Sequence, residues 1–146
     1  MAVDERFSPD RDMTRERGPQ EALDVLATEL LRIHQESYGA SAREVRVHVL
    51  DDAVVCFLDE LQLMPNEEFL IEAGRSQAVI ELRTQYQQAI ETTFCAAVER
   101  ATGRRVVSFI SATKLSPNYA VEIFRLAPER PREPDSSVDG RLESTP

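Results

Sequence analysis

The segment VRVHVLDDAVVCFL, residues 45–58, decides the fold of this chain. Three valines, Val45, Val47 and Val49, alternate with polar or basic side chains, which is the period of a strand with one buried face. Two aspartates follow as a turn, and residues 53–58 are apolar at every position. The segment therefore predicts a β-hairpin that packs through one face against a core.

A helix is predicted before the hairpin. Its N-terminal signal is the dipeptide Gly18-Pro19, because proline is favoured at the first helical position. Its C-terminal signal is Gly39, which can adopt the left-handed conformation that ends a helix. Apolar side chains recur at helical spacing between these points: Leu23, Leu26, Leu30 and Ile33.

Two further helices are predicted after the hairpin. Pro65 lies in the first turn of a short helix that runs to about Ala73, and Gly74 breaks it. A long helix then begins near Ser76, which we expect to cap it, and ends at Gly103. Its expected buried stripe consists of Val79, Arg83, Tyr86, Ile90, Phe94, Ala97 and Ala101.

Two more strands, residues 106–110 and 119–126, complete the pattern. The order α-β-β-α-α-β-β predicts an α+β fold, a two-layer sandwich with a four-stranded, mainly antiparallel sheet packed against helices. We expect residues 20–127 to form one domain. Residues 1–19 are a charged arm and residues 128–146 a proline-rich tail, and both are too polar to be ordered.

One face of such a sheet is left open. We expect it to carry Arg46, His48, Glu122 and Arg125 among apolar neighbours. A second copy of the chain would cover this face, so the sequence predicts a homodimer.

Charge and composition exclude several classes of protein. The net charge of −9 at pH 7 would repel phosphate backbones, so we expect no nucleic-acid partner. The apolar runs are far shorter than the ~20 residues that cross a bilayer, so we expect no direct membrane insertion. Cys56 and Cys95 lie in apolar contexts without CxxC spacing, which is typical of a cytoplasmic protein.

No combination of residues predicts a catalytic or metal site. His34 and His48 are the two histidines of the chain, and they lack the spacing of metal ligands. Neither cysteine has a nearby histidine to deprotonate it, and the glycines are too isolated to form a phosphate-binding loop. We therefore expect no catalytic residue, no metal and no cofactor, and hence a non-enzymatic protein.

Glu67, Gly74, Arg75 and Arg83 form the one cluster that points to a possible ligand or partner site. Arg83 falls on the otherwise apolar stripe of the long helix, and a buried guanidinium needs a carboxylate partner. Glu67 or Glu68 could supply it. The preferred interpretation is an ion pair that ties the short helix to the long one, and the alternative is a site for a small anion.

A second candidate is the run Gly103-Arg104-Arg105. Two basic residues at the negative end of a helix are favoured by its dipole, which is a sufficient local explanation. The same run could also serve as a basic contact for a protein partner.

Several segments, taken in order, resemble the YbcI or MpsC family. They are LLRIHQESYG at 30–39, the hairpin at 45–58, residues 67–75, Arg83, VERATGRRV at 98–106 and AVEIFRL at 120–126. The most specific piece is Glu-Arg-x-Thr-Gly-Arg-x-Val at 99–106, followed by Val-Glu-Ile-Phe at 121–124. The resemblance covers residues 20–127. Two loops depart from the family pattern, at residues 39–41 and 63–65.

The resemblance implies a small cytoplasmic accessory protein with no known chemistry. For the named member it implies association with membrane subunits that move cations or support uptake of inorganic carbon. The first hypothesis is thus a dimeric, non-enzymatic interaction protein, held at the inner face of the membrane through a partner. The alternative is a domain that senses a small ligand or anion near Arg75 and Arg83.

Overall fold

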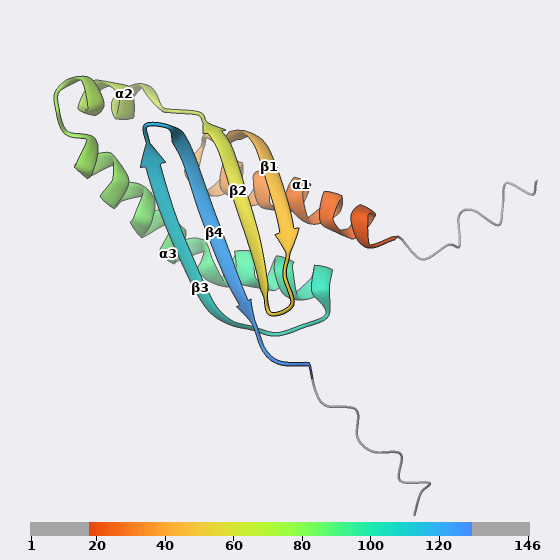
Figure 1. Ribbon diagram of the computed structural model, residues 1–146. Coiled ribbons are helices and arrows are strands. Elements are labelled where there is room, and N and C mark those ends of the chain that lie inside the picture. The colour runs from red at the N-terminus through yellow and green to blue at the C-terminus, as the bar shows by residue number, and fades with distance from the viewer. Residues whose placement is uncertain (1–17, 130–146) are drawn as a thin grey trace, which may run out of the picture.

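The computed structural model describes residues 18–129. Its elements are α1 (Pro19–Tyr38), β1 (Ala42–Val49), β2 (Ala53–Leu61), α2 (Pro65–Glu72), α3 (Ser76–Thr102), β3 (Val106–Leu115) and β4 (Asn118–Leu126) (Figure 1). The predicted order of elements is therefore confirmed. The predicted arm and tail lie outside the described residues, apart from the two positions of each that border the domain.

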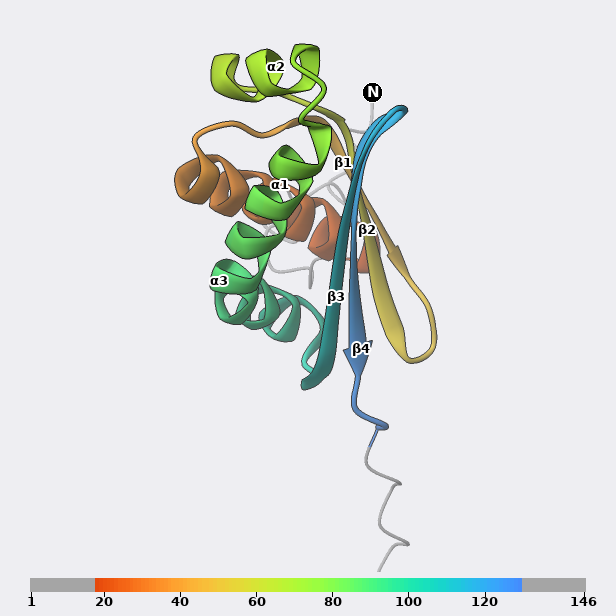
Figure 2. The same cartoon turned by 90° about the vertical axis from the view of Figure 1, so that its left-hand side faces the viewer.

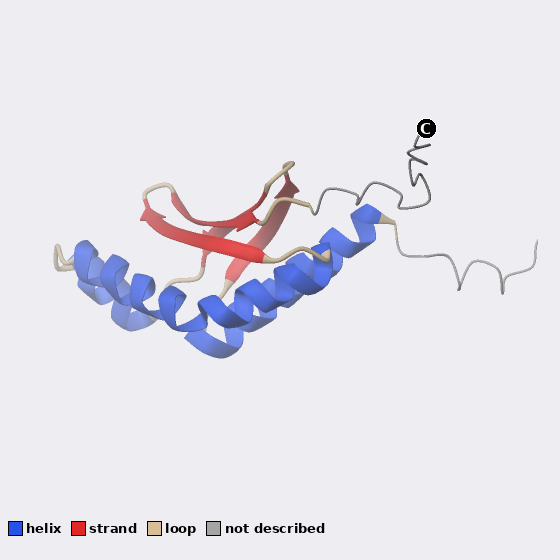
Figure 3. Ribbon diagram, turned by 90° about the horizontal axis from the view of Figure 1, so that it is seen from below, coloured by secondary structure: helices blue, strands red, loops and turns tan. Residues whose placement is uncertain are grey.

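The four strands form one antiparallel sheet in the order β1-β2-β4-β3. The two hairpins thus meet through β2 and β4, which become the central strands. Figures 2 and 3 show α1 and α3 on one side of the sheet, and no helix of residues 18–129 lies on the other side. This arrangement confirms the two-layer α+β sandwich.

The core lies between α1, α3 and the face of the sheet that they cover. On α3, Phe94 packs against Phe109 of β3 with 6.3 Å between ring centroids. Phe109 in turn contacts Phe124 of β4 at 5.0 Å. From α1, Leu26 and Leu30 reach the same cluster and are almost fully buried. Burying a leucine of this kind stabilises the fold by about 1.5–3 kcal/mol, so these contacts hold the layers together.

The two long helices end where the sequence predicts. Gly39 and Gly103 follow α1 and α3 with φ angles of 87° and 69°. In both cases the glycine N–H donates a hydrogen bond to the carbonyl four residues earlier. Only glycine adopts this left-handed conformation without strain, so these two positions send the chain back toward the sheet.

Alternation along the strands assigns each side chain to one face. In β4, Ala120, Glu122, Phe124 and Leu126 are buried toward the helices. The residues between them point to the opposite side, which we call the open face. The pairing registers then place on the open face Glu44, Arg46 and His48 of β1, Val55, Phe57 and Asp59 of β2, Tyr119, Val121, Ile123 and Arg125 of β4, and Ser108, Ile110, Ala112 and Lys114 of β3.

One predicted member of the open face is therefore wrong. Arg46, His48 and Arg125 lie there as expected, but Glu122 points into the layer between sheet and helices and is 1% exposed. Both faces of this strand carry apolar side chains, so composition alone does not decide which face Glu122 is on. Phe124 resolves it, because this large ring fills the core and Glu122 lies two residues away on the same face.

The third strand is longer than predicted. β3 continues through Ser111 to Leu115, because these residues pair with β4 as far as Leu115 opposite Asn118. Small polar residues in this stretch resemble a loop in composition. Their pairing with β4 satisfies the backbone, which explains why they remain in the sheet.

Two details of α3 also differ from the prediction. Tyr86 is 41% exposed, and Gln87 is buried on the stripe in its place. Arg83 and Ile90 are two turns apart, and the 3.6-residue period allows either intermediate position to face inward. Ser76 is the first residue of the helix rather than its cap; Arg75 is at the cap position and makes no side-chain capping bond.

We expect Leu30→Ala to lower the free energy of unfolding by about 2–5 kcal/mol, because it leaves a cavity in the core between α1 and the sheet. The control is Val25→Ala on the same helix, where the side chain is 46% exposed and the expected change is within about 0.5 kcal/mol. Urea unfolding followed by circular dichroism measures both. Equal losses in the two variants would contradict this description of the core.

Candidate functional site

Arg83 and Glu67 form a buried ion pair at one end of the domain. Arg83 Nε donates to Glu67 Oε2 at 2.6 Å, and Arg83 Nη2 donates to Glu67 Oε1 at 2.9 Å. Only 2% of the arginine and 1% of the glutamate is exposed. The two-point geometry is the strongest that an arginine and a carboxylate adopt. The preferred sequence interpretation is thus what the structure contains, with Glu67 rather than Glu68 as the partner.

Three more groups complete the hydrogen bonding of this pair. The Tyr38 hydroxyl donates to Glu67 Oε2 at 2.8 Å, and the N–H of Met64 donates to Glu67 Oε1 at 2.8 Å. Arg83 Nη2 also donates to the carbonyl oxygen of Gln62 at 3.0 Å. The pair therefore joins the end of α1, the link from β2, the short helix α2 and the long helix α3.

One aromatic ring covers the guanidinium, and two further rings pack against that ring. The Arg83 Cζ atom lies 4.6 Å from the centre of the Tyr38 ring, within the range of a cation–π contact. His34, one turn earlier on α1, stacks on the same ring at 5.9 Å, and Tyr86 meets it edge-on at 4.8 Å. The sequence analysis missed Tyr38 and His34. Their spacing of four residues from each other and from Leu30 continues the buried stripe of α1, and that signal could have found them.

The pair shifts the pKa values around it. Burial alone would raise the pKa of Glu67, but the hydrogen bonds from Arg83, Met64 and Tyr38 outweigh it and lower the pKa below its usual value. Burial, followed by the charge of Arg83, lowers the pKa of His34 to about 4. Burial and the bond to Glu67 raise the pKa of Tyr38. At neutral pH the network therefore holds one anion and one cation, with His34 and Tyr38 uncharged.

This arrangement makes Arg83 a poor receptor for an external anion. Its Nε and Nη2 atoms are bonded to Glu67 and Gln62, and one face of the guanidinium is against Tyr38. A ligand would have to displace Glu67, leaving a carboxylate buried without its partner at a cost of several kcal/mol.

The structure separates Gly74 and Arg75 from the ion pair. Both are exposed in the turn between α2 and α3, where Gly74 has a φ angle of 76°. The predicted cluster of four residues is thus two buried residues with a packing role and two exposed residues at a turn.

The run Gly103-Arg104-Arg105 lies beyond the C-terminal end of α3. Arg104 Nη1 donates to the carbonyl oxygen of Asp51 at 2.6 Å, and Nη2 donates to that of Ala127 at 2.8 Å. Arg104 therefore ties the β1–β2 turn to the chain that leaves β4. Arg105 is exposed, so it is the member of this run that a protein partner could contact.

Glu122 is a second buried acidic group, and sequence analysis placed it on the wrong face. In residues 18–129 neither of its carboxylate oxygens has a hydrogen-bond partner. Burial raises the pKa of Glu122 to about 8, although the neighbouring Ser111 hydroxyl partly offsets this rise. Burial raises the pKa of Cys56, which is opposite Glu122 on β2, to about 12, and the charge of Glu122 adds to this rise. Both groups are thus uncharged at neutral pH.

An open cavity lies between α3 and β3, beside Ser111, the residue opposite Glu122 in the sheet. Gln87 and Ser111 line it, together with residues of α3 and β3, and it has a volume of about 480 Å³. The Gln87 Oε1 and Ser111 Oγ atoms are buried and, within the described part of the chain, have no hydrogen-bond partner. Ordered water is the usual occupant of such a polar cavity.

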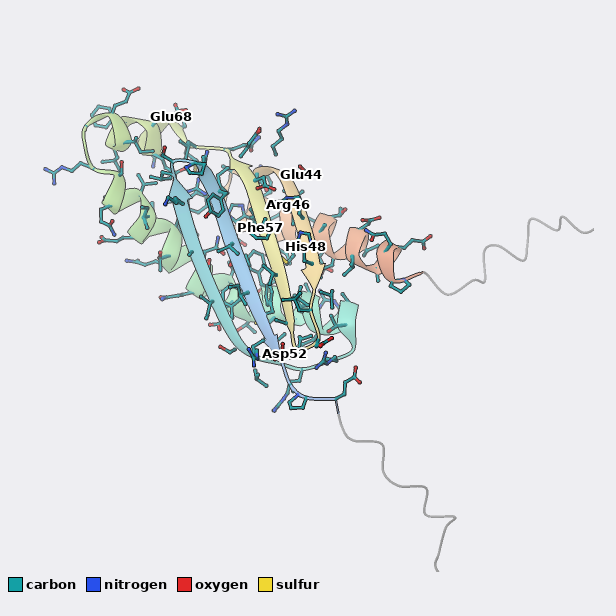
Figure 4. The ribbon with its side chains drawn as sticks, in the orientation of Figure 1. Glu44, Arg46, His48, Asp52, Phe57 and Glu68 are labelled. Atoms are coloured by element: carbon teal, nitrogen blue, oxygen red, sulfur yellow. The ribbon has the colours of Figure 1, made fainter. Side chains whose placement is uncertain are left out.

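The open face combines apolar and charged side chains. Figure 4 shows Arg46, Phe57 and His48 together on the side of the sheet that faces the viewer. The Arg46 guanidinium lies 4.8 Å from the centre of the Phe57 ring and is bonded to Asp59 at 2.6 Å. The His48 ring meets the Phe57 ring edge-on, with 5.9 Å between the ring centroids. This surface has the composition of an interaction site more than that of a reaction site.

In residues 18–129, no three His, Cys, Asp or Glu side chains come together in a way that could hold a metal ion. None of the helices in that range is both long and apolar enough to cross a membrane.

Comparison with known proteins identifies the family. The family model described as "Na+-translocating membrane potential-generating system (MpsC)" matches residues 20–128. The chain belongs to the MpsC family. Comparison with curated proteins and with solved structures gave no match. Membership relates this MpsC chain to a Na+-translocating system that generates membrane potential, and the match covers every helix and strand except the first residue of α1.

We expect Arg83→Met to lower the free energy of unfolding by about 3–5 kcal/mol, since it leaves Glu67 buried without its cation. The control is Arg32→Met, whose ion pair with Glu36 is exposed and contributes at most about 1 kcal/mol. Replacing both partners, in Arg83→Met with Glu67→Leu, should recover part of the loss. Urea unfolding gives the three values. If Arg83→Met is as stable as the control, the pair has no structural role and an anion site becomes the better explanation.

We expect Glu122→Gln to remove part of the pH dependence of stability. The folded pKa of Glu122 is about 8, above its unfolded value, so the folded state binds the extra proton and loses stability as the pH rises from about 4.5 to 8. Between pH 5 and 8.5 the variant should therefore gain roughly 2–4 kcal/mol relative to the wild type. The matched control is Glu21→Gln in the exposed first turn of α1. If the free energies of unfolding of wild type and Glu122→Gln change with pH in parallel, the pKa of Glu122 is not raised in the folded state.

Proposed function

We propose that this chain is a non-enzymatic accessory subunit of a cation-translocating membrane system. It works at the cytoplasmic face of the membrane and is held there by partner proteins. Membership of the MpsC family supports the link to a Na+-translocating system. The buried ionisable groups support a non-enzymatic role, because Glu67 and Arg83 bind each other and Glu122 is enclosed between the layers.

The open face is the observation that carries the proposal. Antiparallel sheets with one face in water usually place polar side chains there. Here the two central strands instead place Val55, Phe57, Val121 and Ile123 on that face, and Ile110 of the neighbouring strand is 59% exposed. The four central side chains are half-buried among their neighbours, and together with Ile110 they form a contiguous, partly exposed apolar surface. Apolar surface of this kind marks a site of protein association. A chain with such a surface is suited to work within an assembly.

The test is co-purification of the full-length tagged chain from native membranes in a mild detergent. We expect membrane-spanning subunits of a cation-translocating system among the recovered proteins, identified by mass spectrometry. Phe57→Glu on the open face should abolish recovery, since it places a charge in the middle of the apolar surface. The matched control is Phe69→Glu on α2, where the ring is 70% exposed, and it should behave as the wild type.

A second measurement ties recovery to function. Membrane vesicles that lack the chain should form a smaller Na+-dependent membrane potential, and adding the purified wild-type protein should restore it. Circular dichroism checks that both phenylalanine variants are folded. Recovery of the chain without any membrane-spanning subunit, together with an unchanged potential in vesicles that lack it, would overturn the proposal.

A further inference from the structure

The side chains of the open face form rows across the sheet. The pairing registers give three complete rows, each running from β1 through β2 and β4 to β3. They are Glu44, Asp59, Tyr119 and Lys114; then Arg46, Phe57, Val121 and Ala112; then His48, Val55, Ile123 and Ile110. The middle of the face is apolar, and its charged groups lie on the edge strand β1 or near the ends of the other strands. This is the layout of an interface with an apolar centre and a polar rim.

The first row has opposite charges at its two ends. Glu44 is at the β1 edge and Lys114 at the β3 edge, and both are exposed. Asp59, next to Glu44, is already bonded to Arg46 within the chain. Glu44 and Lys114 have no salt-bridge partner among the described residues and are therefore available for an external contact.

We propose that a second copy of the chain covers the open face. The two copies are related by a two-fold axis that lies midway between the two facing sheets, runs parallel to the strands, and passes over the line between β2 and β4. Rotation about this axis exchanges the two edges of the sheet and keeps each row at its own level. Glu44 of one copy then faces Lys114 of the other, and symmetry makes this contact twice. In the next rows Phe57 faces Val121 and Val55 faces Ile123, so apolar side chains meet apolar side chains.

The dimensions of the sheet suit this arrangement. Stacked sheets lie ~10 Å apart, a gap that extended Glu and Lys side chains can bridge together. Strands of 8–10 residues, four across, cover roughly 19 by 30 Å at ordinary strand spacing and rise. Two such faces bury on the order of 1,100 Å², which exceeds the ~1,000 Å² expected of a specific interface.

The direction of the axis makes the proposal specific. A two-fold axis across the strands would keep β1 against β1 and reverse the order of the rows. Lys114 would then face Ser108 of the partner copy, at the other end of β3, and the Glu44–Lys114 contact would not form. Exchanging the two charges therefore distinguishes the two arrangements.

The experiment measures the mass of the full-length chain by light scattering and sedimentation at micromolar concentrations. The wild type should have twice the mass of one chain. Lys114→Glu and Glu44→Lys should each weaken the dimer at least tenfold, because each places like charges opposite one another twice. The double variant Glu44→Lys with Lys114→Glu should restore the dimer. Arg75→Glu, which changes the net charge as Lys114→Glu does but lies in the exposed turn between α2 and α3, should leave it intact.

Three results would overturn the inference: a monomeric wild type, a dimer unaffected by either single charge reversal, or a double variant that stays as weak as the single ones. The inference rests on the proposed function and deepens it: the open face associates with the second copy, and the membrane-spanning subunits bind the resulting dimer, so Phe57→Glu abolishes their recovery by breaking the dimer. The two can still fail separately. If the chain is a dimer but recovers no membrane-spanning subunit, the inferred dimer stands and the proposed function is wrong. If the chain is a monomer and still recovers such subunits, the proposed function stands and the inferred dimer is wrong.

Discussion

The buried pair of Glu67 and Arg83 is the constraint on which the rest of this domain depends. Each charge is removed from water, so each needs the other in a fixed geometry. Because Glu67 is on α2 and Arg83 is on α3, the requirement sets the position of the short helix against the long one. Tyr38 and the carbonyl of Gln62 extend the requirement to α1 and to the end of β2. Polar contacts thus complete the domain at the end where its apolar core stops.

The two faces of the sheet have separate tasks. The covered face carries the large side chains that pack against α1 and α3, and it also encloses Glu122, whose raised pKa keeps it uncharged. The open face has no role in that packing, so its apolar middle is free for association. This separation lets a small domain keep a packed interior while one broad face of its sheet stays uncovered by the described helices.

The sequence predicts the fold well where the signals are strong and local. The alternating valines of the first hairpin, the glycines after α1 and α3, and an arginine on an apolar stripe all lead to correct elements and to the correct ion pair. The failures concern choices between two equally apolar possibilities. The phase of Glu122 in β4 depends on whether Phe124 fills the core, and the choice of Gln87 over Tyr86 depends on the direction in which α3 crosses the sheet. Such choices are made by tertiary packing, which a single strand or helix does not encode.

The central position of β4 has a mechanical consequence. The chain leaves the domain from this strand, and Arg104 holds the exit by its bond to the carbonyl of Ala127. A force that pulls on the chain beyond this point would act along β4, which is bonded to a neighbouring strand on each side. It would have to shear two ladders of hydrogen bonds at once instead of unzipping one strand from an edge. The connection after β4 would therefore resist a pulling force better than a connection from an edge strand.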